Sequence, residues 1–97
     1  MPFEVRHDEE HHRYEIVDDV GTVVGAAEYD LDGDRVLFTH TVVVARHRGH
    51  GVAAQLVEAA LDDVRARHRT AVPVCWYVAR FIDERPEYRD LLASASG

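Results

Sequence analysis

The hydrophobic pattern of this chain changes its period in the middle of the sequence. From Arg35 to Ala45 every second residue falls on the same face, as in a long strand. From Gly51 to His68 the apolar residues recur at three- and four-residue steps, which predicts an amphipathic helix. The intervening segment, Arg46–Gly51, must carry the chain from strand to helix. A chain with this pattern is expected to pack a helix against a sheet.

The long strand is predicted to follow two shorter ones. Arg13–Val17 alternates as a half-buried strand does, and Thr22–Tyr29 is predicted to be the second strand. Asp30–Asp34 then indicates a hairpin, because Asp-Gly tolerates the positive φ of tight turns. A regular long strand would divide its residues between two faces, with one face formed by Val36, Phe38, His40, Val42 and Val44, and the other by Leu37, Thr39, Thr41 and Val43.

After the helix, Thr70–Val74 is predicted to be a short buried strand, and Pro73 places it at an edge or a splayed end. Cys75–Glu84 has the pattern of a second helix, which Pro86 ends. A strand, a crossover helix and a strand in one sheet form a right-handed parallel pair. The predicted fold class is therefore α+β, with a mixed, mostly antiparallel sheet and two main helices.

The 97 residues are expected to form a single domain, because a second core would leave each half too small. Residues 1–12 and 93–97 are expected to be poorly ordered. The net charge of −7 argues against nucleic-acid binding, which needs a basic surface. No apolar run approaches the roughly 18–20 residues of a membrane span.

The single cysteine, Cys75, cannot form an internal disulfide, and the polar, acidic segment Met1–Glu10 does not resemble a secretory signal. We therefore expect a cytoplasmic protein, and the bias toward Ala, Val, Arg and Asp suggests a bacterial source. No metal site is predicted. His7–His11 has Asp8 where a zinc-protease helix has its general-base glutamate, and no apolar helix surrounds it. Asp30–Asp34 has its glycine too early for a calcium loop.

Arg46–Gly51 is the most basic stretch of this acidic chain, and it lies where a helix begins. The first turn of a helix has unpaired N–H groups and partial positive charge, and glycines let a phosphate approach the backbone. The segment therefore suits an anion such as a pyrophosphate. An ordinary strand-to-helix loop with solvated charges remains the alternative interpretation.

The Arg-x-x-Gly-x-Gly spacing of this loop resembles the coenzyme A signature of the GNAT superfamily of N-acetyltransferases. Four motifs narrow the resemblance to the short, single-domain GNAT-like (GCN5-related) N-acetyltransferase family: Thr39-His40-Thr41, Arg48-Gly49-x-Gly51, Val72-Pro73-x-Cys75 and Pro86-Glu87-Tyr88. The resemblance runs from about Arg13 to Leu92. It implies a minimal GNAT-like fold that binds acetyl-coenzyme A as cosubstrate.

The resemblance also implies roles for particular residues. The strand end would pair with the pantetheine arm, and the loop amides would receive the pyrophosphate, so that the coenzyme-binding residues are Val42, Val43, Val44, Arg46, Arg48, Gly49, His50, Gly51, Val52 and Ala53. Two positions depart from the family pattern. Val42 stands where an acidic residue is common, and Arg85 replaces the histidine usual before Pro-Glu-Tyr.

Three side chains are candidate catalysts, and each has a structural alternative. His40 could be the general base, or a core histidine hydrogen-bonded within the sheet. Cys75 could protonate the leaving thiolate or carry the acyl group, or it could be a small buried hydrophobe. Tyr77 could act as a general acid, or it could be a packing residue.

The expected function is N-acetyl transfer from acetyl-coenzyme A to an amine, through a ternary complex, with His40 or a water as base. Alternatives are a non-catalytic acyl-coenzyme A-binding module, or an interaction protein whose loop binds no ligand. The expected partners are coenzyme A and an amine acceptor, either a small molecule or a peptide. The chain is expected to be a monomer or a weak homodimer. Its acceptor side would be open or completed by a second subunit, because the N-terminal helices of ordinary GNAT enzymes are not evident.

Overall fold

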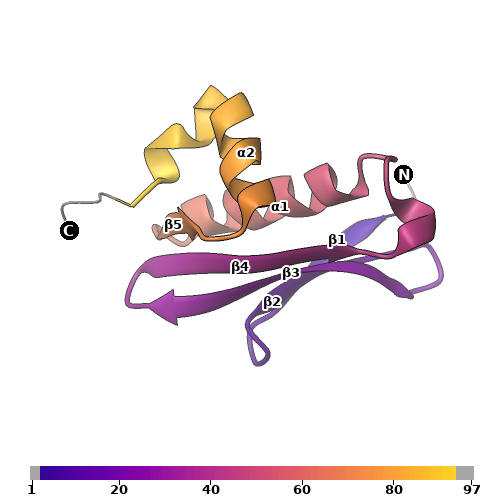
Figure 1. The fold of residues 1–97 in the computed structure, drawn as a ribbon. Helices are drawn as coiled ribbons and strands as arrows, with labels where there is room; N and C mark the ends of the chain where they lie inside the picture. Colours follow the sequence, from indigo (N-terminus) through magenta and orange to yellow (C-terminus); the bar gives the residue numbers. More distant parts are fainter. Residues whose placement is uncertain (1–2, 94–97) are drawn as a thin grey trace.

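The computed structural model describes residues 3–93, which form one sheet covered by helices on one face (Figure 1). The strands lie in the sheet in chain order, and the elements are β1 (Glu4–Asp8), β2 (Arg13–Val17), β3 (Val23–Asp32), β4 (Arg35–Val43), the 3₁₀ helix η1 (Ala45–His47), α1 (Val52–Ala66), β5 (Thr70–Pro73), α2 (Trp76–Glu84) and the 3₁₀ helix η2 (Pro86–Leu91). The first four strands are antiparallel, whereas β4 and β5 are parallel. This confirms the predicted α+β class with its mostly antiparallel sheet. No helix within residues 3–93 is long and apolar enough to cross a membrane.

The sheet has one more antiparallel strand than the sequence predicts. Residues 1–12 were expected to be poorly ordered, but Glu4–Asp8 forms β1 and pairs with β2 in regular register. The alternating hydrophobic pattern that predicts a strand is weak in β1, because one of its inward positions is a histidine. His7 is nonetheless half-buried, and its ring stacks on Tyr14 at 4.0 Å between centroids. Of the tail expected to be poorly ordered, residues 94–97 lie outside the described part.

A β-bulge in β4 changes the faces predicted for the long strand. Glu28 pairs with His40 but Tyr29 pairs with Phe38, so Thr39 has no opposite residue. Before the bulge Phe38 points toward the helices, whereas after it His40 and Val42 point to the open face. The exposed fraction of the residue rises from 1% at Phe38 to 57% at Val42. The prediction of one continuous face was therefore wrong beyond Phe38, because a one-residue slip reverses every later side chain.

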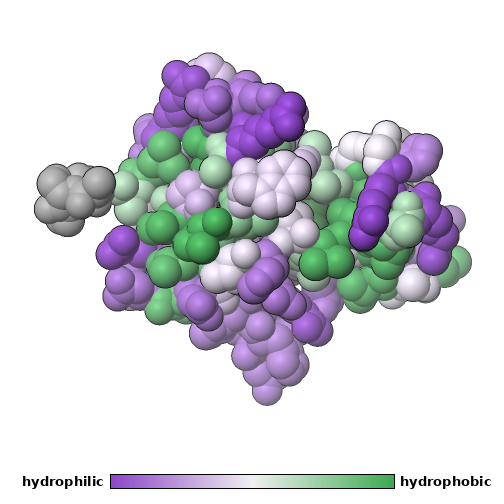
Figure 2. Space-filling view, in the orientation of Figure 1, coloured by the Kyte–Doolittle hydropathy of each residue, from purple (hydrophilic) through white to green (hydrophobic). Residues whose placement is uncertain are grey.

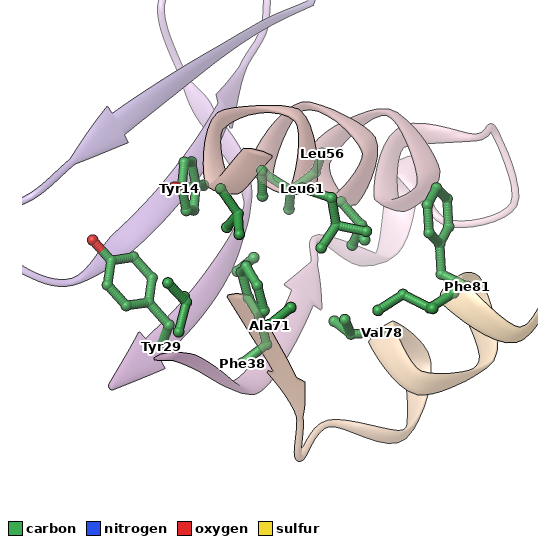
Figure 3. Close-up of a cluster of buried hydrophobic side chains, with 14 of the residues drawn as sticks. Tyr14, Tyr29, Phe38, Leu56, Leu61, Ala71, Val78 and Phe81 are labelled. Atoms are coloured by element: carbon green, nitrogen blue, oxygen red, sulfur yellow. The ribbon is translucent and has the colours of Figure 1, made fainter. Parts of the chain in front are cut away.

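The core lies between the sheet and the helices (Figure 3). The amphipathic pattern of α1 is confirmed, since its six buried residues are Val52, Leu56, Val57, Ala60, Leu61 and Val64. The helix ends at Ala66, two residues before the predicted end, and His68 has a φ of 57°. From α2 the core receives Val78, Phe81 and Ile82. The helices therefore cover one face of the sheet, and the open face meets solvent.

β4 and β5 pair along only part of their length. Their parallel pairing ends at Phe38 and Pro73, and the backbone N–H of Cys75 then donates to the carbonyl of Phe38 at 2.7 Å. β5 lies at the end of the strand order, as the proline predicts. Beyond Phe38 the backbone of β4 continues past the bulge without pairing to β5.

Gly25 on β3 lies close to residues of both β2 and β4. A Cβ atom there would come within 3.0 Å of both Ile16 Cγ2 and the Val42 carbonyl oxygen. Gly25→Ala should therefore lower the free energy of unfolding by about 1–3 kcal/mol, although alanine is otherwise the better strand residue. Urea denaturation measures the change. An unchanged or increased stability would show that the neighbouring strands can move apart at no cost.

Candidate functional site

The segment between β4 and α1 leaves the start of the helix without a cap. Gly51 is the N-cap residue with a φ of 76°, and no side chain caps α1. The first turn also contains no acidic residue. The backbone N–H groups of that turn are therefore available to an anion, and the helix dipole favours negative charge at this position.

Two glycines give the loop both its conformation and its open space. Gly49 and Gly51 have φ values of 81° and 76°, which L side chains rarely adopt. A Cβ atom built on either residue would meet no atom within 4 Å. The space beside both glycines is therefore open. A phosphate group could approach the loop backbone there.

The loop borders a pocket of about 330 Å³. Its walls come from the end of β4, the loop, the first turn of α1 and the start of α2, and the lining residues are Val43, His47, Arg48, Gly49, Gly51, Val52, Ala53, Ala54 and Tyr77. Figure 2 shows the surface hollowed between α2 and the segment that joins β4 to α1. The pocket thus joins an apolar wall to the uncapped helix end.

Six of the ten predicted coenzyme-binding residues line this pocket, and four do not. Val42 points to the open face, Val44 is half-buried, and Arg46 and His50 are exposed outside the pocket. The N–H of Val44 already donates to the carbonyl of Val24 at 2.9 Å. Sequence reasoning missed His47 and Ala54. Ala54 could have been found from its place in the first helical turn.

The Arg48 side chain folds back onto the end of β4. Its Nε donates to the Val43 carbonyl at 3.1 Å. One of the two arginines of the basic segment therefore lies on the pocket wall and fixes the loop to the strand end. The guanidinium keeps further N–H donors that can reach an anion, because arginine carries five.

Cys75 lies where β4 and β5 diverge, and it is the N-cap residue of α2. Its Sγ is 3.5 Å from Oγ1 of Thr41, a residue that the bulge turns toward the helices. Burial raises the pKa of the Cys75 thiol, but donors outweigh it: the Thr41 hydroxyl and the backbone N–H groups of Val78, Tyr77 and Thr41. The net pKa lies below the ordinary value, as expected at a helix N-terminus. Cys75 is half-buried and packs against the core without being one of its fully buried residues.

Tyr77 follows two residues later and contributes to the pocket wall. Its ring also packs near Phe81, with 6.5 Å between centroids, so part of its role is structural. Burial raises the pKa of the Tyr77 hydroxyl, which therefore keeps its proton at neutral pH. Tyr77 can donate a proton toward the pocket.

His40 is on the other side of the sheet from this pocket. Its side chain is 71% exposed, and Nδ1 lies 3.8 Å from Oε1 of Glu28. The alternative interpretation of a core histidine was therefore wrong. Thr39 and His40 border a shallow depression on the open face, whereas Thr41 points to Cys75. Within the Thr39-His40-Thr41 motif, the side chain of His40 therefore lies on the open face of the sheet, whereas that of Thr41 lies on the helix face.

No group of three or more metal-ligating side chains that could hold an ion occurs within residues 3–93. The candidate site combines the uncapped helix end with a pocket that has Tyr77 in its wall. Cys75, with its lowered pKa, does not line this pocket and lies beside the diverging strands, two residues before Tyr77.

Comparison with known proteins gives this arrangement a family. The sequence model described as GCN5-related N-acetyl-transferase matches residues 13–91. Protein NATD1 from Bos taurus is 39% identical over 59 residues, which are 60% of this chain and 52% of that protein. Protein NATD1 from Homo sapiens is 37% identical with the same two shares. The chain spans about half the length of the curated relatives it matches.

A solved structure has the same fold. A GCN5-like protein from Staphylococcus aureus superimposes with a TM-score of 0.73, covering 96% of this chain and 90% of its own, at 20% identity. The curated relatives named above are from eukaryotes, so a bacterial source for this chain stays a prediction. The family match extends over most of the chain and includes the loop, Cys75 and Tyr77. This chain belongs to the GCN5-related N-acetyltransferase family.

Proposed function

We propose that this chain transfers the acetyl group of acetyl-coenzyme A to an amine. The observation that supports the proposal best is the uncapped start of α1, where two positive-φ glycines open onto the 330 Å³ pocket. Such a site suits a ligand with a phosphate end and a long arm that can lie in the pocket. Membership of the family supports the same cosubstrate.

The residues present fit coenzyme A as a ligand. The amides of Gly51 and the first turn of α1, with the Arg48 guanidinium, would hold the phosphates. The pantetheine arm would lie along the end of β4, where the chain no longer pairs with β5. Val43 supplies a carbonyl there, which now accepts the bond from Arg48.

Acetyl transfer requires that the amine lose one proton and that the departing thiolate of coenzyme A gain one. The amine nitrogen attacks the thioester carbonyl carbon, the carbon–sulfur bond breaks, and the amine proton passes to His40 or to a water. The departing thiolate takes a proton from the Cys75 thiol or the Tyr77 hydroxyl. Because His40 lies on the open face and Cys75 on the helix face, an acceptor would approach from the open face and meet the thioester at Thr39–Thr41.

A non-catalytic acyl-coenzyme A-binding module is the second candidate. Val42 supports it, because this residue lies exposed on the open face beside His40 and has no carboxylate to remove a proton. Release of free thiol with a panel of amines separates the two candidates. The cytoplasmic location, the monomeric or weakly dimeric state and the absence of nucleic-acid and membrane partners stay predictions.

Coenzyme A should stabilise the fold, by about 2.7 kcal/mol at a hundredfold excess over Kd. Gly51→Asn should raise Kd about 10- to 100-fold, because asparagine tolerates the positive φ while its side chain fills the space beside the helix amides. Isothermal titration calorimetry measures the affinity. A Gly51→Asn protein that binds coenzyme A as well as the wild type would place the site elsewhere.

The hairpin glycine supplies a matched control. Gly33 also has a positive φ, 60°, and open surroundings, but it lies in the turn between β3 and β4. Gly33→Asn should leave the affinity for coenzyme A unchanged. An equal loss in both variants would mean that asparagine acts through the fold and not through the loop.

His40→Gln should fold normally, because the side chain is exposed and buries nothing. If the imidazole is the base, kcat should fall about 10²- to 10⁴-fold with the Kd of coenzyme A unchanged, and the rise of activity with pH should lose one ionisation. Steady-state kinetics with circular dichroism gives both readouts. Wild-type kcat in the folded variant would assign proton removal to water.

Cys75 should react with iodoacetamide along a pH curve whose midpoint lies below that of a free cysteine, because its pKa is lowered. Thr41→Val keeps the shape of the side chain and removes the hydroxyl donor, so it should move the midpoint upward. Bound coenzyme A should slow the reaction. A stable acetyl adduct on Cys75 after incubation with acetyl-coenzyme A alone would show a covalent route in place of direct transfer.

A further inference from the structure

The residue before β1 contacts the proposed coenzyme loop. The rings of Phe3 and His47 meet edge to face, with 5.4 Å between centroids and an interplanar angle of 90°. His47 is the last residue of η1 and lines the pocket. Phe3 itself is half-buried against the core. This contact comes from a part of the chain that lies outside the family match, which begins at residue 13.

The same segment also contacts α1. Nε2 of Gln55 donates to the carbonyl of Phe3 at 3.5 Å, and Gln55 is the fourth residue of the helix. Phe3 therefore touches the loop on both sides of its glycines, at His47 before them and at Gln55 after them.

The other end of β1 is held firmly to the sheet. His7 stacks on Tyr14, and its Nε2 lies 2.6 Å from the hydroxyl oxygen of Tyr29 on β3. Between the two ends, Val5 packs against the core. Phe3 thus precedes a strand that pairs with β2 from Glu4 to Asp8, so it can hold the loop in turn.

The loop's own hydrogen bonds are local. His47 donates to the Val44 carbonyl, and Arg48 donates to Ala45 through its backbone N–H and to Val43 through its side chain. These bonds join residues within 43–48. The Val44 N–H also donates to the Val24 carbonyl and ties the start of η1 to β3, whereas the contact between η1 and the residue before β1 comes from the Phe3 ring.

We propose that Phe3 is a positioning residue for the coenzyme loop, which it holds in the binding conformation through His47 and Gln55. The proposal rests on the proposed function, because the loop must bind coenzyme A for its position to matter. A loop that occupies the binding conformation only part of the time binds more weakly in proportion. Removing the ring should therefore lower the affinity for coenzyme A, although the substitution changes no residue that lines the pocket.

The test compares Phe3→Leu, Phe3→Tyr and the control Val5→Ala. Leucine keeps an apolar side chain in place and removes the ring, and tyrosine restores the ring. Calorimetry gives the Kd of coenzyme A, and hydrogen exchange gives the protection of the amides of residues 45–51 in the free protein. Phe3→Leu should raise Kd about 2- to 12-fold, the factor that corresponds to one aromatic pair, and reduce loop protection.

The control and the rescue variant decide whether the effect is specific. Phe3→Tyr should restore both readouts, and Val5→Ala should lower stability while leaving Kd and loop protection unchanged. Unchanged readouts in Phe3→Leu would overturn the proposal, and so would an equal change in Val5→Ala, which would indicate fraying of β1. If the wild type binds no coenzyme A, the proposed function fails, and loop protection alone still decides whether Phe3 positions the loop.

Discussion

One extra residue in β4 organises the candidate site. At Thr39 the strand carries a residue that has no partner on β3, while its pairing with β5 ends one residue earlier. The slip turns Thr41 toward the helices and His40 toward solvent. Without it, Thr41 could not reach the sulfur of Cys75, and the two faces of the sheet would not offer different chemistry at one point along the chain.

The hydrophobic core holds this arrangement rigid. Phe38 is buried directly before the bulge, under α1 and α2, and its carbonyl accepts the N–H of Cys75. Gly25 lets β3 approach the end of β4 closely, because no Cβ atom separates it from the Val42 carbonyl. The strand ends that form the pocket are therefore fixed by packing, whereas the loop side of the pocket is built from glycines and the uncapped first turn of α1.

Much of the fold could be predicted from the sequence because its signals are local. The six apolar residues of α1 follow the helical period and are all buried. Asp-Gly marks the hairpin, and Pro73 marks the edge strand. Gly49 and Gly51 were identified from their type and place, and both have positive φ. β1 escaped prediction because His7 is buried by stacking on Tyr14, a contact that depends on strand pairing.

The sequence alone determined which residue types meet at the helix start: glycines, arginines and no acidic side chain. It also determined the order of strands and helices from β2 to α2, because periodicity and turn residues act over a few neighbouring positions. Tertiary structure decided the rest. The bulge, the exposure of His40, the Thr41–Cys75 pair and the contact of Phe3 with His47 all depend on strand register, which is set by packing between segments distant in the chain and not by any one segment's own pattern.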